Sequence, residues 1–443
     1  MIEDVHEKWR KWHPQYGPVN QTWNGPLSRV IYVGDPNLIR KIANENWPKF
    51  PGQYAGFQPL SGSALFAQMD QGRWKQLRKG LAPSFQPSTV NDQYSSLHKY
   101  LGKFVDTIDA AAQENTTLDL SVLHVLLTLD FVGEVAFGTE LHAIRDGAGC
   151  RILQIFHNIL PKLMKCGLFP LRAKIPIMKS TRVMLNSIKE LRDLGHVAVR
   201  NARASNGGSN DYTGNKRIYE ILALARGSDG QYLFSLEELV DNYVTFLVAG
   251  GDPTAHTLTF AVYEIIRNPA VLAKILKELD SVLPEDCFIP TIEQVLRLPY
   301  LHLVIKETLR FNRPGFGTFR YTPKDVEIDG TTLPANTTLA LWNPQVHRDP
   351  QVWGEDVDEF KPERWETSDK EKRAIPGSYF PFSYGPRKCM GEGLAMLEMS
   401  LTLATLFKRY ELTLEPGFEM IFQPSFTLCS RNGLPVKARL RRA

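Results

Sequence analysis

The segment Phe382-Ser-Tyr-Gly-Pro-Arg-Lys-Cys389-Met-Gly391 places one cysteine in a short turn directly before a long apolar helix. Gly385 allows a tight turn, the proline after it stiffens that turn, and Gly391 allows the next turn to approach closely. The unpaired N–H groups at the start of the helix favour a thiolate by roughly 0.3–2 kcal/mol. Arg387 adds positive charge that suits the thiolate or a bound carboxylate. These features suit a cysteine that binds a metal, although a core cysteine in a glycine-rich turn has the same pattern.

The other four cysteines are far apart in the sequence. No CxxC motif and no paired Cys/His spacing occurs, and an odd number of cysteines does not form a disulfide framework. This pattern favours a reducing compartment. We expect four of the thiols to be small buried hydrophobes: Cys150, Cys166, Cys287 and Cys429.

Charge and hydropathy limit the possible partners. The 443 residues carry a formal net charge of +4 without a long run of Lys or Arg, so nothing indicates a nucleic-acid partner. No uninterrupted apolar run reaches the length of about 18 residues that a spanning helix needs. The sequence fits either a soluble protein or one from which an N-terminal anchor has been removed.

The organisation is mainly α with small β elements at both ends, and we expect one domain over residues 1–443. A β-rich part covers about 18–60 and includes a turn at Asn24-Gly25-Pro26. Helices fill about 70–315, interrupted by a polar, glycine-rich surface loop over 203–215. Residues from about 316 to 443 contain β hairpins, the cysteine loop and the last helix.

A long central helix follows the polar loop. Ser235 and Glu238 form the pattern of a capping box, and Pro269 closes the helix after roughly 33 residues. Farther on, Asp329-Gly330 between two short extended runs predicts a type I′ hairpin.

The cysteine segment resembles the FxxGxRxCxG haem-binding signature of the cytochrome P-450 family. The matching residues are Phe382, Gly385, Arg387, Cys389 and Gly391. The resemblance implies the fold of that family, in which a haem lies between the long central helix and the cysteine loop before the last long helix. Cys389 would then be the axial ligand of the iron in haem b.

Two further motifs resemble the family in the same order along the chain. Glu307 and Arg310 have the ExxR spacing, and Arg364 lies in a segment similar to the family's PERF motif. The resemblance implies a buried structural triad of these three residues beneath the haem. Trp74 and Arg78 match a WxxxR motif, and the resemblance implies that they bind the haem propionates together with Arg387 and a third arginine, Arg320.

The run Ala249-Gly250-Gly251-Asp252-Pro253-Thr254 resembles the family's oxygen-activating segment. Ala249 and Gly250 would lie against the cofactor, and the acid and alcohol at Asp252 and Thr254 would deliver protons. Pro253 departs from the family, which has threonine at this place. It removes a hydroxyl and a backbone donor, and we expect it to kink or open the helix.

Three outcomes remain open because of Pro253. The enzyme hydroxylates with water or a substrate hydroxyl completing the relay, or it catalyses desaturation, ring formation or rearrangement, or it uses a peroxide without a reductase. A haem-binding sensor or carrier without turnover is a fourth alternative, which the retained Asp252 disfavours.

The substrate regions suggest a lipophilic small molecule such as a terpenoid, another secondary metabolite or a lipid. The apolar residues that the resemblance places there are Leu65, Phe66, Phe246, Phe316 and Phe426.

The resemblance to the microsomal branch implies dioxygen as co-substrate, an NADPH-dependent flavoprotein reductase, and a monomer on the cytosolic face of the endoplasmic reticulum membrane. A cytoplasmic location is the alternative. A basic patch suited to an acidic reductase would contain Arg73, Lys75, Lys79 and Lys388. The apolar segment 152–178 either contacts the membrane surface or packs as an ordinary helix.

Overall fold

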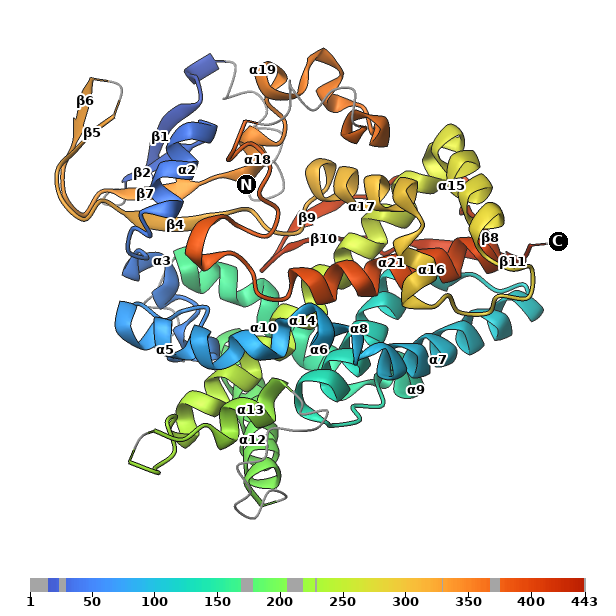
Figure 1. Cartoon of the computed structure of the whole chain (residues 1–443), viewed down its shortest axis with the longest axis horizontal. Helices are drawn as coiled ribbons and strands as arrows, with labels where there is room; N and C mark the ends of the chain where they lie inside the picture. Colours follow the sequence, from blue (N-terminus) through green and yellow to red (C-terminus); the bar gives the residue numbers. More distant parts are fainter. Residues whose placement is uncertain are drawn as a thin grey trace.

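A computed structural model of the chain describes residues 15–23, 29–168, 178–204, 218–227, 229–328, 330–366 and 375–441. The fold is mainly α, and its four-stranded sheet and its three-stranded sheet lie at opposite sides of the helices (Figure 1). The expected polar loop falls largely on residues outside the described ranges, since α12 (Lys179–Ala204) ends where that loop begins.

A four-stranded sheet pairs two strands from the N-terminal part of the chain with two strands from residues 318–341. The strand β1 (Val19–Trp23) pairs antiparallel with β2 (Arg29–Val33), as the sequence predicted, while the turn between them lies outside the described residues. β2 pairs parallel with β7 (Thr338–Leu341), which pairs antiparallel with β4 (Thr318–Tyr321). The blue and orange strands therefore lie together in Figure 1.

The expected hairpin at Gly330 is present. β5 (Val326–Ile328) pairs antiparallel with β6 (Thr331–Leu333), and Gly330 has a φ of +74°. A type I′ turn requires positive φ at its central positions, which glycine adopts without steric cost. Asp329 lies outside the described residues.

The N-terminal β-rich part is shorter than the sequence predicted, because the strands stop at Val33 and helices follow. Each of these helices has a proline in its first turn, where the missing N–H costs nothing and the fixed φ suits a helix. They are α2 (Pro36–Asn44), α3 (Pro51–Ala55) and α4 (Gln58–Ser61).

Further helices surround a central one, and their apolar faces form one continuous core. Before the central helix the elements are α5 (Gln71–Leu81), η1 (Ala82–Phe85), α6 (Pro87–Asn91), α7 (Tyr94–Gln113), α8 (Leu120–Phe137), α9 (Ala143–Asp146), η2 (Gly147–Gly149), α10 (Arg151–Leu168), α12 and α13 (Ile218–Leu224). After it come α15 (Pro269–Val282), α16 (Ile292–Leu296), α17 (Pro299–Phe311), α18 (Asn343–Val346), α19 (Pro350–Trp353), η3 (Glu355–Asp358), η4 (Pro362–Trp365), η6 (Gly385–Arg387) and α21 (Glu392–Arg409).

The central helix is α14 (Leu236–Arg267), which begins with the predicted capping box of Ser235 and Glu238. Its 32 residues pack against α8, α12, α17 and α21. The helix continues without interruption through Pro253, so the expected opening at this residue does not occur. One reason is support from α8, where the Thr128 hydroxyl donates a 2.8 Å hydrogen bond to the carbonyl of Gly251.

Two small sheets close the C-terminal part. β8 (Tyr410–Leu414) pairs with β11 (Pro435–Leu440), which also pairs with β3 (Leu118–Asp119). β9 (Phe422–Pro424) and β10 (Leu428–Ser430) form a hairpin whose turn, residues 425–427, points toward α14.

Two apolar helices were candidates for membrane contact. Within the described residues, α8 is long and apolar enough to cross a membrane, but most of it is buried in the core. The apolar side chains of α10 that the structure describes also join the core, including Ile155, Ile159 and Leu163. They pack as an ordinary helix, and residues 169–177 of the proposed membrane segment lie outside the described ranges.

Candidate active site

Backbone hydrogen bonds close the loop that carries Cys389. The Cys389 N–H donates to the Phe382 carbonyl at 2.8 Å, and the Lys388 N–H donates to the Gly385 carbonyl at 3.0 Å. Cys389 is accessible, whereas Cys150 and Cys166 are buried as expected for core thiols. Its sulfur is therefore not packed as a small hydrophobe.

The electrostatic surroundings of Cys389 differ from the sequence prediction. Removal from bulk water raises the pKa of the thiol, although the Gly391 N–H and the positive charges of Arg78 and Lys388 lower it. The start of α21 favours the thiolate, as the sequence predicted, but this effect does not outweigh the loss of water around the sulfur. A bound metal ion would, because coordination deprotonates a thiol outright.

The two glycines of the loop have different roles. Gly385 has a φ of +71°, and a Cβ there would lie 2.5 Å from the Ala43 carbonyl oxygen at the end of α2. Glycine is thus required at this position both for the turn and for the contact with α2. A Cβ at Gly391 would meet only the Cys389 sulfur, at 3.9 Å, and the Phe85 ring, at the same distance, so no close approach demands glycine there.

A group of cations lies beside the cysteine loop. The guanidinium of Arg387 stacks over the Trp74 ring at 4.2 Å, and that of Arg78 lies 5.8 Å from the same ring. Arg387 also donates to the Asn46 side chain at 2.9 Å. Arg320 is 2% exposed and donates to the Thr318 hydroxyl at 2.6 Å. The structure thus brings together all four predicted propionate-binding residues.

Lys49 completes this cationic cluster, which we define as Lys49, Arg78, Arg320 and Arg387. Lys49 is 7% exposed and donates to the Phe66 carbonyl. Burial and the charges of Arg320 and Arg387 hold the pKa of Lys49 well below its usual range. The sequence analysis missed this residue because a single lysine after a proline matches no motif.

The cationic cluster requires a negative partner. Among the described residues, no carboxylate pairs with Lys49, Arg320 or Arg387. Burial and the charge of Arg320 lower the pKa of Arg387 to about 10. Arg320 Nε and Arg387 Nη2 are buried without a hydrogen-bond acceptor. Because buried cations are otherwise paired, this cluster fits a bound group with carboxylates, such as the two propionates of a haem.

The predicted triad is assembled below the loop. Glu307 Oε1 lies 2.8 Å from Arg310 Nη2 and 2.8 Å from Arg364 Nε, and the side chains of all three residues have no exposure. The Lys361 N–H and the Trp365 indole donate to Glu307 as well, both at 3.0 Å. A carboxylate with this many partners is fixed in place. The triad can therefore hold the 3₁₀ helix η4, which precedes the cysteine loop, against α17.

On α14 the structure separates the predicted site residues. Phe246, Ala249 and Pro253 have accessible surface in a helix that is otherwise largely buried, and their spacing of three and four residues puts them on one face. Asp252 and Thr254 are buried, at 5% and 6% exposure. Thr254, the alcohol that the sequence proposed for proton delivery, is therefore not on the accessible face.

Gly250 and Gly251 make room for α8 and α10. A Cβ at Gly250 would lie 2.6 Å from Val132, and one at Gly251 would lie 3.3 Å from Leu129. The absence of a side chain at these positions is thus explained by helix packing.

Asp252 binds two residues that the sequence analysis did not select for catalysis. The Thr427 hydroxyl, in the turn between β9 and β10, donates to Asp252 Oδ2. His256 Nε2, one helical turn farther along α14, lies 3.2 Å from Asp252 Oδ1. The i, i+4 spacing of Asp252 and His256 was visible in the sequence, but only the tertiary fold brings Thr427 to them.

Most of the predicted apolar pocket residues lie near one another. Phe426 lies 6.2 Å from Phe66 and 5.5 Å from Phe57, centroid to centroid. Leu65 follows in the same chain segment as Phe66, and its N–H donates to the Asn242 side chain of α14 at 3.1 Å. Phe316 instead stacks on Trp342, which follows β7 of the four-stranded sheet, at 5.9 Å.

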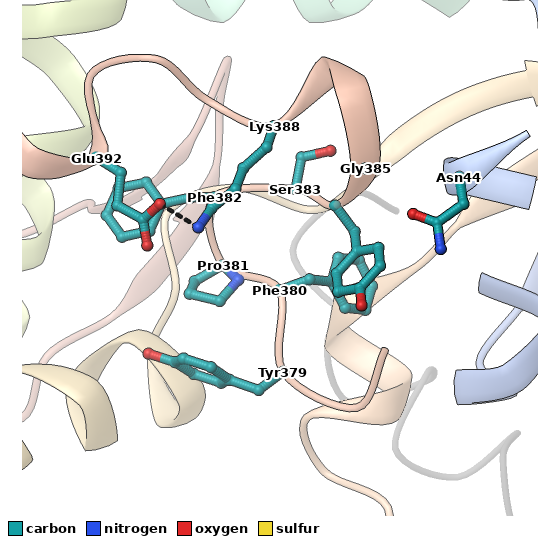
Figure 2. A pocket seen from close by; sticks show the side chains of 10 residues that line it. Asn44, Tyr379, Phe380, Pro381, Phe382, Ser383, Gly385, Lys388 and Glu392 are labelled. Atoms are coloured by element: carbon teal, nitrogen blue, oxygen red, sulfur yellow. Dashed lines mark ion pairs between the residues drawn. The ribbon is translucent and has the colours of Figure 1, made fainter. Parts of the chain in front are cut away.

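A hollow of about 350 Å³ lies beside the cysteine loop. Cys389 is not among the residues that line it. Figure 2 shows Tyr379, Pro381 and Phe382 around it, with Lys388 extended toward Glu392. That ion pair measures 2.5 Å. The expected basic patch has less net positive charge than predicted. Lys388 is paired with Glu392, and Arg73 is paired with Glu238 at 2.6 Å.

Comparison with known proteins agrees with this geometry. A family model described as cytochrome P450 matches residues 2–434. Thromboxane-A synthase of Sus scrofa is 26% identical, with 98% of this chain and 87% of that protein covered. Cytochrome P450 CYP13A6 of Caenorhabditis elegans is 27% identical (91% and 83% covered), and cytochrome P450 3A14 of Cavia porcellus is 25% identical (93% and 84% covered).

The fold has a solved counterpart. The crystal structure of the cytochrome P450 CYP102L1 superposes with a TM-score of 0.86 at 23% identity, covering 98% of this chain and 94% of that chain. The accessible cysteine, the cationic cluster and these similarities agree with one another. The chain belongs to the cytochrome P450 family of haem-thiolate monooxygenases.

Proposed function

We propose that this protein binds haem b through Cys389 and oxidises a lipophilic small molecule with dioxygen and electrons from an NADPH-dependent flavoprotein reductase. The observation that carries the proposal is the accessible Cys389 sulfur beside buried, unpaired cations. Lys49, Arg320 and Arg387 would hold the propionates, together with Trp74 and Arg78. When bound, the haem supplies dioxygen chemistry that no side chain can perform.

The other residues of the site have separate tasks. Phe57, Phe66 and Phe426 form an apolar surface suited to a terpenoid, another secondary metabolite or a lipid. Asp252 is held by hydrogen bonds in a buried position, where a carboxylic acid can transfer protons. The triad of Glu307, Arg310 and Arg364 keeps the geometry of the segments that support the cysteine loop.

The reduced carbon-monoxide difference spectrum of the purified protein tests the ligand. We expect a strongly red-shifted Soret band that Cys389→Ser abolishes and Cys287→Ser leaves unchanged. An ordinary haem–CO band in the unaltered protein, or no haem, would refute the proposal. A pyridine haemochrome spectrum identifies the porphyrin as haem b or another type.

Turnover measurements test the source of electrons. We expect NADPH consumption that depends both on a flavoprotein reductase and on a lipophilic substrate. The similarity to cytochrome P450 3A14 supports a microsomal protein, so we also propose a monomer on the cytosolic face of the endoplasmic reticulum membrane. Sedimentation of the full-length product with microsomes would support that location, and recovery in the cytosolic fraction would contradict it.

A second candidate function is a haem-thiolate reaction of a different outcome: desaturation, ring formation, rearrangement or use of a peroxide. Two observations favour it, namely Pro253 on the accessible face of α14 and the similarity to a protein named a synthase. Product formation from a hydroperoxide without NADPH would establish the peroxide route. Oxygen-18 from dioxygen in the product would establish the monooxygenase instead.

A further inference from the structure

Pro253 leaves the accessible face of α14 without a hydroxyl. This face carries Phe246, Ala249 and Pro253, whose side chains cannot donate or accept a proton. The partly exposed His256 follows on the same face, three residues after Pro253. Two nearby hydroxyls on α14 are occupied by helix carbonyls: Thr257 donates to the Pro253 carbonyl at 2.8 Å, and Thr259 donates to that of Ala255 at 2.8 Å. A hydroxyl for a proton path therefore has to come from another element.

Thr427 supplies such a hydroxyl from a distant part of the chain. It stands 175 residues after Asp252 and donates to the Oδ2 atom of that carboxylate. Its backbone carbonyl accepts from the Ser425 N–H at 2.9 Å, which fixes the turn between β9 and β10. The neighbouring Phe426 belongs to the aromatic cluster of the pocket, so the same turn contacts both that cluster and Asp252.

His256 completes the arrangement on the other carboxylate oxygen. Its Nε2 atom lies 3.2 Å from Asp252 Oδ1, and its side chain is 13% exposed. Its Nδ1 atom is buried and has no hydrogen-bond partner among the described residues. An imidazole that binds a carboxylate through one nitrogen can release a proton there, and its partly exposed ring can regain a proton from solvent.

The other titratable neighbours are not suited to this task. Cys429, on β10, faces Asp252, and burial raises the pKa of its thiol to about 12. His124, on α8, faces His256, and burial lowers the pKa of its imidazole to about 3. Cys429 therefore holds its proton at neutral pH, and His124 does not take one up.

We propose that His256, Asp252 and Thr427 form a proton relay that replaces the helix hydroxyl lost at Pro253; this inference rests on the proposed dioxygen-dependent function. A hydronium ion gives a proton to His256 and leaves as water, and His256 gives one from Nε2 to Asp252 Oδ1. The carboxyl turns and gives that proton to Thr427 Oγ, and Thr427 gives its own hydroxyl proton into the pocket. Each group thereby regains its starting number of protons and its starting charge.

Variants of Thr427 test the relay during turnover. Thr427→Val removes the hydroxyl at equal volume, and we expect about a tenfold rise in hydrogen peroxide released per NADPH, as for a lost proton-transfer group. Thr427→Ser should restore coupling, and Pro253→Thr in the Thr427→Val background should restore part of it. Thr405→Val is the matched control, because its buried hydroxyl donates to a helix carbonyl at 2.7 Å on α21. Unchanged coupling in Thr427→Val, with the carbon-monoxide spectrum intact, would overturn the relay.

An NMR experiment tests the same contacts without turnover. In protein labelled with ¹⁵N-histidine, His256→Gln identifies the His256 signals, and we expect a proton on Nε2 whose shift moves in Asp252→Asn and in Thr427→Val. The relay would be refuted, whatever the protein catalyses, if His256 Nε2 carried no proton or if its shift were unchanged in Asp252→Asn. Failure of wild-type NADPH consumption with these NMR shifts intact would count against the proposed function and leave the relay geometry supported.

Discussion

Glu307 and Arg364 are separated by 57 residues in the sequence, yet their side chains form a 2.8 Å ion pair that has no exposure to solvent. Arg310, one turn along the same helix, donates to both oxygens of the same carboxylate. The donors to Glu307 thus lie on α17 itself and on residues 361–365, and the carboxylate holds these two segments together. The pair connects α17 to the 3₁₀ helix η4, which precedes the cysteine loop.

Removing one partner of this pair should be costly. Arg364→Ala leaves Glu307 buried with one cation fewer, and we expect a loss of about 3–5 kcal/mol in the free energy of unfolding together with poor haem retention. Denaturant unfolding measures the first and the haem absorbance the second. Arg145→Ala, which removes a surface ion pair at 64% exposure, should leave both nearly unchanged. Equal effects of the two variants would contradict the structural role of the triad.

The cationic cluster predicts effects of opposite sign on the apo and haem-bound protein. Lys49→Met removes a buried cation that no described carboxylate pairs, so the apo protein should unfold at a higher denaturant concentration. The same variant should lose haem about tenfold faster, since a charged hydrogen bond to a propionate is worth about 1.5–3 kcal/mol. Transfer of haem to apomyoglobin measures the loss. Lys75→Met serves as a control on the neighbouring helix, and a slower loss from Lys49→Met would exclude Lys49 from the propionate site.

Gly385 should tolerate no side chain. Gly385→Ala forces a left-handed φ on alanine and brings its Cβ against the Ala43 carbonyl, at a cost of about 1–3 kcal/mol. The thiolate spectrum should weaken, because the turn before Cys389 shifts. Gly393→Ala provides the comparison, since nothing lies within 4 Å of its Cβ position, and it should be neutral or slightly stabilising. A fully retained thiolate spectrum in Gly385→Ala would show that α2 yields at this contact.

His124 should make stability depend on pH. Burial lowers its pKa in the folded protein to about 3, whereas the unfolded chain has a pKa of about 6.5. Between these values the unfolded state binds a proton that the folded state does not, so stability falls as the pH falls. We expect a contribution of about 1.4 kcal/mol per pH unit in this window. Urea unfolding at several pH values should show a shallower slope for His124→Phe, and an unchanged slope would place the effect on other groups.

The strands and helices show which elements a local sequence pattern can predict and which it cannot. The capping box at Ser235, the hairpin at Gly330 and the last helix were predictable because each depends on residues close in sequence. The prediction of a β-rich part to residue 60 was wrong because extended-looking segments after Val33 begin helices at prolines. The prediction was that Pro253 kinks or opens α14, and the opening was wrong, since the helix continues through residue 253 and packs on α8.

The sequence alone determined the family, the cysteine ligand proposed for the iron, and most residues of the cationic cluster, because these lie in short motifs with fixed spacing. Tertiary structure alone decided that Lys49 joins the cluster, that Thr254 is turned away from the accessible face, and that Thr427 reaches Asp252. These relationships depend on which distant segments pack together, and burial, unpaired charge and hydrogen bonding across such contacts leave no local pattern in the sequence.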